Sequence, residues 1–205
     1  MRHIHALVAI GVAMWAPGRA QAQDAVDPAL WLGGQLGLSP VGTLKVEAQG
    51  MSASADAATA LELGGRLEFA VHPMISIGFA PALVFNVKGT NDNTSGSQLD
   101  LPLRVHVGGV VAPKVRLYGF AAPGYSILFP PSGGDDQHPS GFMIGFGGGA
   151  RFRLAPRFAL AGELGYQFRF LSETRTLTIL GQTLTTDVSE QVNYLTFTIA
   201  AVAAL

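Results

Sequence analysis

The sequence contains no cysteine and few charged residues. Without cysteine the chain cannot form a disulfide bond, and chemistry that needs a thiolate is excluded. Charged residues are 13% of the chain, about half of the ~25% that is usual in soluble domains. The formal net charge is −1, so the chain has no basic excess that would indicate binding to nucleic acid.

Beyond its first residues the sequence also lacks any apolar run near the ~20 residues that a membrane-spanning helix needs. The run at its start, residues 6–15, is about half that length. Arg2 precedes this run, and Ala20-Gln21-Ala22 follows it with the small-x-small pattern of a cleavage site. Residues 1–22 are therefore predicted to be a secretory signal rather than an anchor, and residues 23–205 to form one domain.

What the sequence does contain is glycine and a regular alternation. Glycine accounts for 26 of 205 residues, nearly twice its usual ~7%. Eight stretches alternate large apolar residues with small or polar ones, which is the period of a β-strand. Most are about 10–13 residues long, closer to the ~9–11 of a tilted membrane strand than to the ~5–6 of a soluble one. The predicted strands are residues 30–39, 61–71, 75–87, 99–111, 115–129, 142–154, 158–170 and 192–205.

One face of each predicted strand carries large apolar side chains, and the other carries glycine, small polar or charged residues. In residues 142–154, for example, Phe142 and Phe146 alternate with Gly145 and Gly147. A soluble antiparallel sheet alternates too, with its apolar face inward, but so much glycine would weaken a solvated outer face. The pattern therefore favours an inverted arrangement, with the apolar face in lipid and the glycine-rich face lining a narrow lumen.

Short and long connections alternate along the chain. The short turns centre on Pro73, Pro113 and Pro156. Their spacing of about 40 residues also suits a propeller blade, but a blade holds four short strands rather than two long ones. The long polar segments are residues 40–60, 88–98, 130–141 and 172–190.

An even number of strands can close into a barrel, which leaves no open edge in the bilayer. We therefore predict an all-β fold: an eight-stranded antiparallel up-and-down transmembrane β-barrel in a bacterial outer membrane, with short periplasmic turns and longer outer loops. Pro123-Gly124 predicts a bulge or bend in the fifth strand. Alternation in residues 177–180 and 183–187 predicts that the last hairpin continues above the membrane.

The eight alternating strands, the three short turns, the leading signal and the absence of cysteine together resemble the small eight-stranded outer-membrane barrel family. This is the type of the outer-membrane protein A transmembrane domain and of the opacity proteins. The resemblance covers nearly the whole mature chain. It implies recognition by the barrel-insertion machinery, which reads a C-terminal strand similar to residues 195–205, although this chain ends in Leu205 where the family usually has an aromatic residue.

Charged residues on the inward face form the first candidate site. An ion pathway or a binding site would use such residues, but an eight-stranded barrel has an interior just wide enough for side chains to fill. Buried charges need partners, and both signs are present. A plug of paired side chains is therefore favoured, formed by Glu62, Arg66, Glu68, Asp100, Arg104, His106, Arg116, Arg151, Arg153, Glu163 and Arg169.

Three further patterns are candidate sites. His138-Pro139-Ser140, with Glu163 as the carboxylate, resembles the Ser-His-Glu arrangement of barrel-shaped lipid A deacylases, although Pro139 departs from that pattern. Asp135, Asp136 and His138 could ligate a hard cation, but such ions want six to eight oxygens. Residues 145–149 are glycine-rich without the following helix that a phosphate loop needs. We therefore predict no catalytic residue, cofactor or metal.

The predicted function is that of a non-enzymatic, porin-like outer-membrane protein with a structural or surface-interaction role. A lipid A deacylase-like enzyme and a narrow solute channel are the alternatives. The expected partners are outer-membrane lipid and lipopolysaccharide, the barrel-insertion machinery and an extracellular ligand of the loops. Nucleic acid is not expected, and the barrel is expected to be a monomer.

Overall fold

The structure of this protein is a computed structural model that describes residues 30–48, 50–88, 95–130, 138–179 and 182–205, without the side chains of residues 175–185. The secretory signal predicted at residues 1–22 lies outside the described residues. Asp135 and Asp136 lie outside them as well.

Every regular element of the described residues is a β-strand. The strands are β1 (Leu30–Ala48), β2 (Met51–Ala57), β3 (Ala60–His72), β4 (Ile75–Phe79), β5 (Ala82–Val87), β6 (Gly96–Ala112), β7 (Val115–Phe129), β8 (Ser140–Ala155), β9 (Phe158–Ile179) and β10 (Gln182–Ala204). No helix in this part of the chain is long and apolar enough to cross a membrane.

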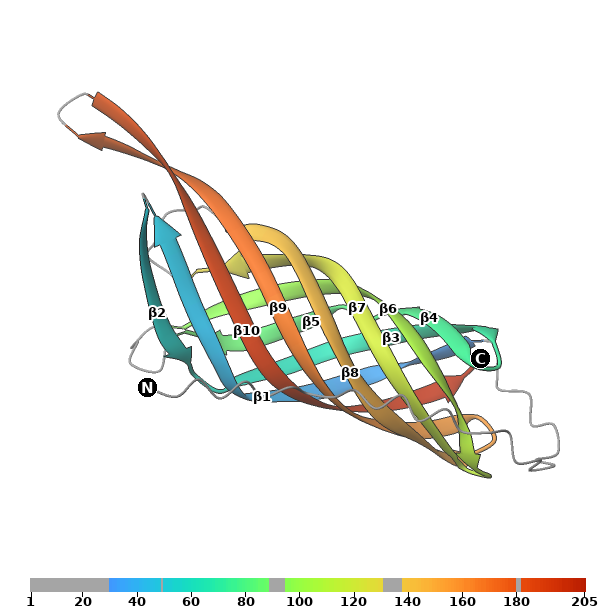
Figure 1. The fold of residues 1–205 in the computed structure, drawn as a ribbon. Coiled ribbons are helices and arrows are strands. Elements are labelled where there is room, and N and C mark those ends of the chain that lie inside the picture. Colours follow the sequence, from blue (N-terminus) through green and yellow to red (C-terminus); the bar gives the residue numbers. More distant parts are fainter. Residues whose placement is uncertain (1–29, 49, 89–94, 131–137, 180–181) are drawn as a thin grey trace.

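The strands close into an antiparallel ring (Figure 1). Closure comes from β1, which pairs with β10 on one side and with β3 on the other. The short strands β4 and β5 share one position, because both pair with β3 and with β6. β2 lies outside the ring as a partner of β1. The ring therefore has eight positions, as the alternation of the sequence predicts.

Beyond the ring, the outer ends of β1, β10 and β9 form one sheet with β2, in the order β2-β1-β10-β9 (Figure 1). The β9–β10 extension follows the sequence prediction, with pairs up to Ile179–Gln182. The β1–β2 hairpin corrects it, because residues 40–60 were expected to form a loop. In residues 44–48, apolar and charged side chains alternate as they do in a strand. A register shift between Leu38 and Val41 lets β1 continue along β10. Gly50, with a φ of 76°, lies in the turn that returns the chain as β2.

Large apolar side chains point out of the barrel and charged ones point in. Leu36, Leu103 and Ile199 are 64%, 57% and 67% exposed, whereas Arg66 and Arg169 are 2% and 1% exposed. A soluble protein would bury the first group and expose the second. The described strands thus have the inverted arrangement that the glycine-rich face predicts.

Prolines interrupt the hydrogen-bond ladder at one level of three neighbouring strands. The predicted strand 75–87 breaks at Pro81 into β4 and β5. The predicted bulge at Pro123 is wrong, because β7 keeps a continuous register with β8. Proline has no N–H to donate, and the β6–β7 pairing simply lapses between the pairs Pro102–Gly124 and Val105–Ala121.

We expect backbone amides at residues 79–83, 101–105 and 121–125 to exchange with solvent deuterium faster than those in the β9–β10 ladder at the same depth. Fewer ladder hydrogen bonds hold this part of the wall, so local opening costs less free energy. Hydrogen exchange of the micelle-bound barrel, followed by mass spectrometry, measures the difference. Equal protection in both walls would show that the prolines do not weaken the ladder.

Candidate functional site

The lumen holds the charged residues that the sequence predicts to face inward. Ten of the eleven are buried, and Arg153 is half-buried. They come from five ring strands, β3, β6, β7, β8 and β9. Most lie in three clusters that follow one another along the barrel from the end with the short turns.

The first cluster surrounds Glu68. Its carboxylate pairs with Arg151 and accepts a hydrogen bond from Ser76 Oγ at 2.6 Å. His106 Nδ1 lies 3.6 Å from Glu68 Oε1. The guanidinium of Arg151 lies 5.3 Å from the ring centroid of Trp31, within the range of a cation–π contact. Polar and aromatic side chains together close the lumen near the short turns.

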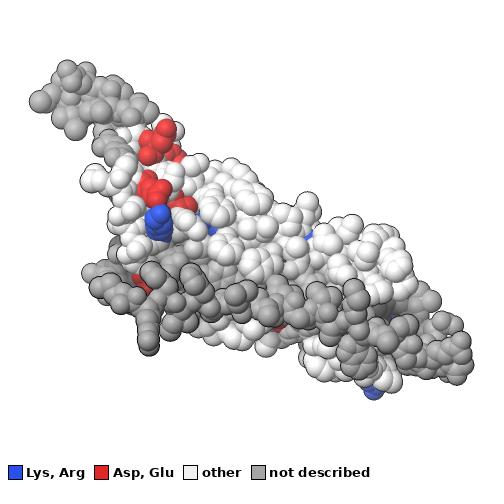
Figure 2. All heavy atoms as spheres, in the orientation of Figure 1, with Lys and Arg blue, Asp and Glu red and all other residues white. Residues whose placement is uncertain are grey.

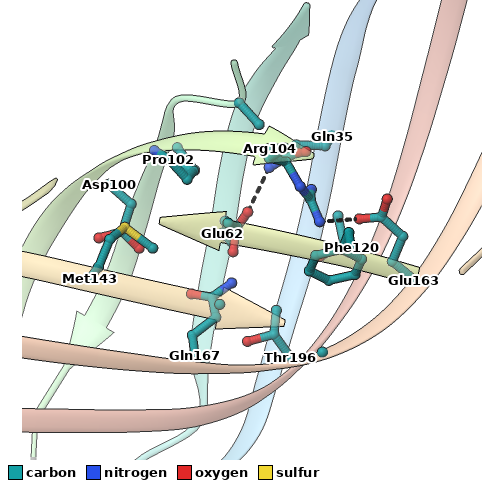
Figure 3. A pocket seen from close by; sticks show the side chains of 16 residues that line it. Gln35, Glu62, Asp100, Pro102, Arg104, Phe120, Met143, Glu163, Gln167 and Thr196 are labelled. Carbon is teal, nitrogen blue, oxygen red and sulfur yellow. Dashed lines mark hydrogen bonds and ion pairs between the residues drawn. The ribbon is translucent and has the colours of Figure 1, made fainter. Parts of the chain in front are cut away.

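The second cluster surrounds Glu163 and lies near the middle of the barrel. Glu163 Oε2 is 2.6 Å from Arg66 Nη2 and 2.9 Å from Arg104 Nη2. Tyr118 donates its hydroxyl hydrogen to Glu163 Oε1 at 2.8 Å. One carboxylate thus holds two cations, and Arg104 also lies 4.2 Å from the centroid of Phe120 (Figure 3).

The third cluster pairs Asp100 with Arg169. Arg169 Nη2 and Nε lie 2.6 Å and 3.0 Å from Asp100 Oδ2. Ser126 and Gln98 donate further hydrogen bonds to Asp100. This carboxylate is satisfied on all sides, as a buried charge requires.

Glu62 is the exception among the lumen carboxylates. Its described contact is one hydrogen bond from Gln35 Nε2 at 2.7 Å, and no described cation lies within 4 Å of it. Glu62 borders a cavity of ≈ 30 Å³, between the second and third clusters (Figure 3). That volume holds about one or two water molecules. The buried Oε1 of Gln35, which has no described partner, is a group that such water would satisfy.

Glycine on the lumen face provides the space for these clusters. A Cβ at Gly147 or Gly165 would lie 2.8 Å from Phe120 Cζ, and one at Gly149 would lie 2.8 Å from Glu163 Cγ. Contacts below 3.0 Å are too close for a real Cβ. These three glycines are therefore required by close packing inside a narrow barrel.

The outer end of the lumen is closed by an apolar cluster that sequence reasoning missed. The sequence contained a signal for this cluster. Val84, Leu171 and Val192 fall at the inward-facing positions of their strands, where most other residues are small or polar. The residues are Ala57, Ala60, Val84, Val87, Leu171, Val192 and Tyr194, with Leu44 and Leu128 packed against them.

The other sequence candidates do not come together. Ser140 Oγ accepts a hydrogen bond from Tyr125 at 2.8 Å, and the His138 ring packs 5.1 Å from that of Phe129. Ser140 pairs with Ser172, nine residues along β9 from Glu163, which corresponds to roughly 30 Å at ~3.3 Å per residue. Residues 145–149 lie within β8. In the described part of the chain no three His, Cys, Asp or Glu residues are grouped as metal ligands.

This geometry agrees with comparisons to known proteins. The family model described as outer membrane protein beta-barrel domain matches residues 6–200. The chain belongs to this family. The search of curated proteins gave no match.

Two solved structures of outer-membrane and surface proteins are similar in fold. The outer membrane protein OprG from Pseudomonas aeruginosa has a TM-score of 0.60 at 12% identity, with 85% of this chain and 94% of that one covered. Neisserial surface protein A has a TM-score of 0.54 at 11% identity, with 86% and 97% covered. At these identities the likeness concerns the fold alone.

As an outer-membrane barrel, the protein lies in the bacterial outer membrane with its exposed apolar face in lipid. Barrels of this kind have short turns in the periplasm and longer segments outside the cell. The turns at Pro73, Pro113 and Pro156 are therefore periplasmic, and the β2-β1-β10-β9 sheet extends outward from the cell.

Proposed function

We propose that this protein is a non-enzymatic barrel that anchors an interaction surface in the outer membrane. The observation that carries the proposal is a contrast between its two parts. The lumen is occupied by ion pairs and by an apolar cluster, whereas a sheet of four strands extends outward beyond the ring. The extended sheet is the part that an extracellular ligand can reach.

The two alternatives have less support. A deacylase-like centre needs its histidine within hydrogen-bond reach of the serine and a carboxylate to orient that histidine. The hydroxyl of Ser140 is instead bonded to Tyr125, and Glu163 is bonded to Arg66, Arg104 and Tyr118. A channel needs a continuous open path, and the paired clusters occupy three levels of this lumen.

The proposed partners follow from the position of the barrel in the outer membrane. Outer-membrane lipid contacts the exposed apolar face, and lipopolysaccharide surrounds the outer rim of the barrel. The barrel-insertion machinery assembles the chain through its C-terminal strand. Because the ring closes on itself through β1 and β3, the barrel needs no second copy and is proposed to act as a monomer.

Shortening the β9–β10 hairpin tests this function. Thr174 pairs with Asp187, so residues 175–186 can be replaced by an Asn-Gly turn without disturbing the pairs below. We expect bacteria carrying this variant to lose attachment to whichever of a panel of immobilised extracellular proteins and polysaccharides the wild type binds. The amount of folded barrel at the surface should be unchanged, since the lumen clusters lie elsewhere.

A control distinguishes surface interaction from enzymatic action. The masses of lipid A from bacteria with the wild-type barrel, with Ser140→Ala and without the protein are expected to be identical. Loss of an acyl chain that depends on Ser140 would favour the deacylase. Attachment that survives the shortened hairpin would contradict the role of that extension.

A further inference from the structure

An open cavity of ≈ 310 Å³ lies at the outer ends of β5, β6 and β7. We call it the rim cavity. Its volume is at the lower end of the ~300–1,000 Å³ that is usual for small-molecule sites. These three strands are not part of the extended sheet, which consists of β2, β1, β10 and β9. The lining of the rim cavity includes Phe85, Asn86, Ser95, Ser97 and Phe129.

The strand register places the rim cavity on the outer face of the barrel. Ser97 of β6 pairs with Phe85 of β5 on one side and with Phe129 of β7 on the other. Residues directly opposite each other point to the same face of a sheet, and Phe85 is 42% exposed on the apolar outer face. Neighbouring strands are ~4.8 Å apart, so the two phenylalanines rise about 10 Å from each other. The small serine between them leaves a groove with two aromatic walls.

The rim cavity lies where the barrel leaves the lipid. One row closer to the middle of the barrel, the outward residues Leu83, Leu99 and Ile127 are all apolar. One step beyond Ser97 the lining becomes polar, with Ser95. On the face shown in Figure 2 the wall carries few charged atoms up to the acidic atoms of the outer end. A ligand in the rim cavity therefore lies at the level of the lipid headgroups of the outer leaflet.

Local contacts hold both sides of the rim cavity in place. The register between β5 and β6 shifts around Asn86, whose φ is 65°. Bulges and positive φ angles at residues other than glycine often occur at functional sites. The Asn86 side chain donates from Nδ2 to the carbonyl oxygen of Thr59 at 2.6 Å, which fixes the amide beside the cavity. On the other side, the ring of His138 packs 5.1 Å from that of Phe129.

The chemistry of the lining indicates the class of ligand. None of the described residues that line the rim cavity is charged, so a phosphate or a carboxylate would have no counter-charge there. An acyl chain alone would leave the hydroxyl and amide groups unused. A sugar ring has both kinds of surface, because its C–H face packs on aromatic rings and its hydroxyls exchange hydrogen bonds with serine and asparagine. The lining therefore fits a neutral sugar ring.

We propose that the rim cavity binds a neutral pyranose ring in the core headgroup of lipopolysaccharide. The ring lies between Phe85 and Phe129, and its hydroxyls form hydrogen bonds with Ser97 and Asn86. A glycolipid held at this site fixes the rim of the barrel at one depth in the outer leaflet. The inference goes beyond the proposed function, because none of these residues belongs to the extended sheet.

The test uses the full-length barrel in micelles of a zwitterionic detergent. The probe is the dephosphorylated core oligosaccharide of lipopolysaccharide from the bacterium that makes the barrel. A titration followed by saturation-transfer NMR measures its Kd and shows which sugar protons contact the protein. We expect saturable binding that salt changes little, with the strongest transfer to ring C–H protons. Lipid A freed of its core sugars and the extracellular glucan maltoheptaose should both fail to displace the oligosaccharide.

Three variants examine the rim cavity itself. Phe85→Leu keeps an apolar side chain but removes one aromatic wall, and it should weaken binding about threefold to tenfold. Phe142→Leu is the matched control, because Phe142 is 51% exposed on the outer face and does not line the cavity. It should bind as the wild type does. Ser97→Leu fills the groove from its floor and should abolish binding. Each variant is first checked for folding by its migration on a detergent gel before and after boiling.

Several results would overturn the proposal. These are no saturable binding of the oligosaccharide, equal affinities of Phe85→Leu and Phe142→Leu, and wild-type affinity of Ser97→Leu. Displacement by lipid A would assign the rim cavity to the lipid part of the molecule, and displacement by maltoheptaose would assign it to extracellular glycans. The hairpin-shortened barrel should bind the oligosaccharide as the wild type does, so failure of this inference is distinguishable from failure of the proposed function.

Discussion

Leu103→Arg is expected to reduce sharply the fraction of barrel that folds into lipid vesicles. Leu103 lies near the middle of β6 and is 57% exposed on the outer face, where the lipid lies. An arginine at the midplane of the bilayer on this face costs about 2–4 kcal/mol. Folded and unfolded fractions can be read from migration on a detergent gel without boiling, since a closed membrane barrel often resists detergent.

The neighbouring position provides the matched comparison. Arg104 has the opposite phase and is 7% exposed inside the lumen, so Arg104→Leu removes a charge from a cluster and adds none to lipid. Glu163 keeps Arg66 as a partner at 2.6 Å in that variant, and insertion should change less. Normal folding of Leu103→Arg in vesicles would mean that the outer apolar face is not in lipid.

Glu163→Gln is expected to give the largest loss of stability among substitutions in the lumen. The change preserves size but leaves Arg66 and Arg104 near an amide in place of a carboxylate. Removing one partner of a buried ion pair typically costs about 3–5 kcal/mol, because the remaining charge is left unpaired. The midpoint of unfolding in guanidinium chloride, measured on the vesicle-inserted barrel, should fall accordingly.

Glu62→Gln is the matched control for this substitution. It makes the same chemical change in the same lumen, but Glu62 has no described cation within 4 Å and is bonded to the neutral Gln35. Its unfolding midpoint should stay close to that of the wild type. In the double variant of Glu163→Gln and Arg104→Gln only Arg66 is left without a carboxylate, so part of the loss should be recovered. Equal effects of Glu163→Gln and Glu62→Gln would show that the ion pairs do not hold the lumen together.

The sequence was sufficient to predict which charged residues face the lumen, because side chains alternate between the two faces of a strand. It could not predict which of them pair. Arg66 and Glu163 are 97 residues apart, and their contact depends on the stagger between β3 and β9, two strands that do not pair with each other. Stagger is set by closure of the whole barrel, so no local pattern contains it.

The predicted strand boundaries differ from the observed ones for more local reasons. Proline was expected to disturb β7 at Pro123, yet the ladder tolerates it there through a short lapse of pairing with β6. The strand break occurs instead at Pro81, between β4 and β5. The sequence of β2 predicts a loop, because it is mostly serine and alanine and lacks the alternating large apolar residues of a membrane strand. Above the membrane no lipid selects such residues, and pairing with β1 is sufficient.

Planar-bilayer recording tests most directly the central claim that this barrel is a closed anchor. The ion-pair clusters and the apolar cluster at the outer end of the lumen predict that folded wild-type protein adds no steady current to that of the bare bilayer. A reproducible, ohmic current from barrels shown to be folded in the same preparation would contradict the closed lumen and favour the solute channel.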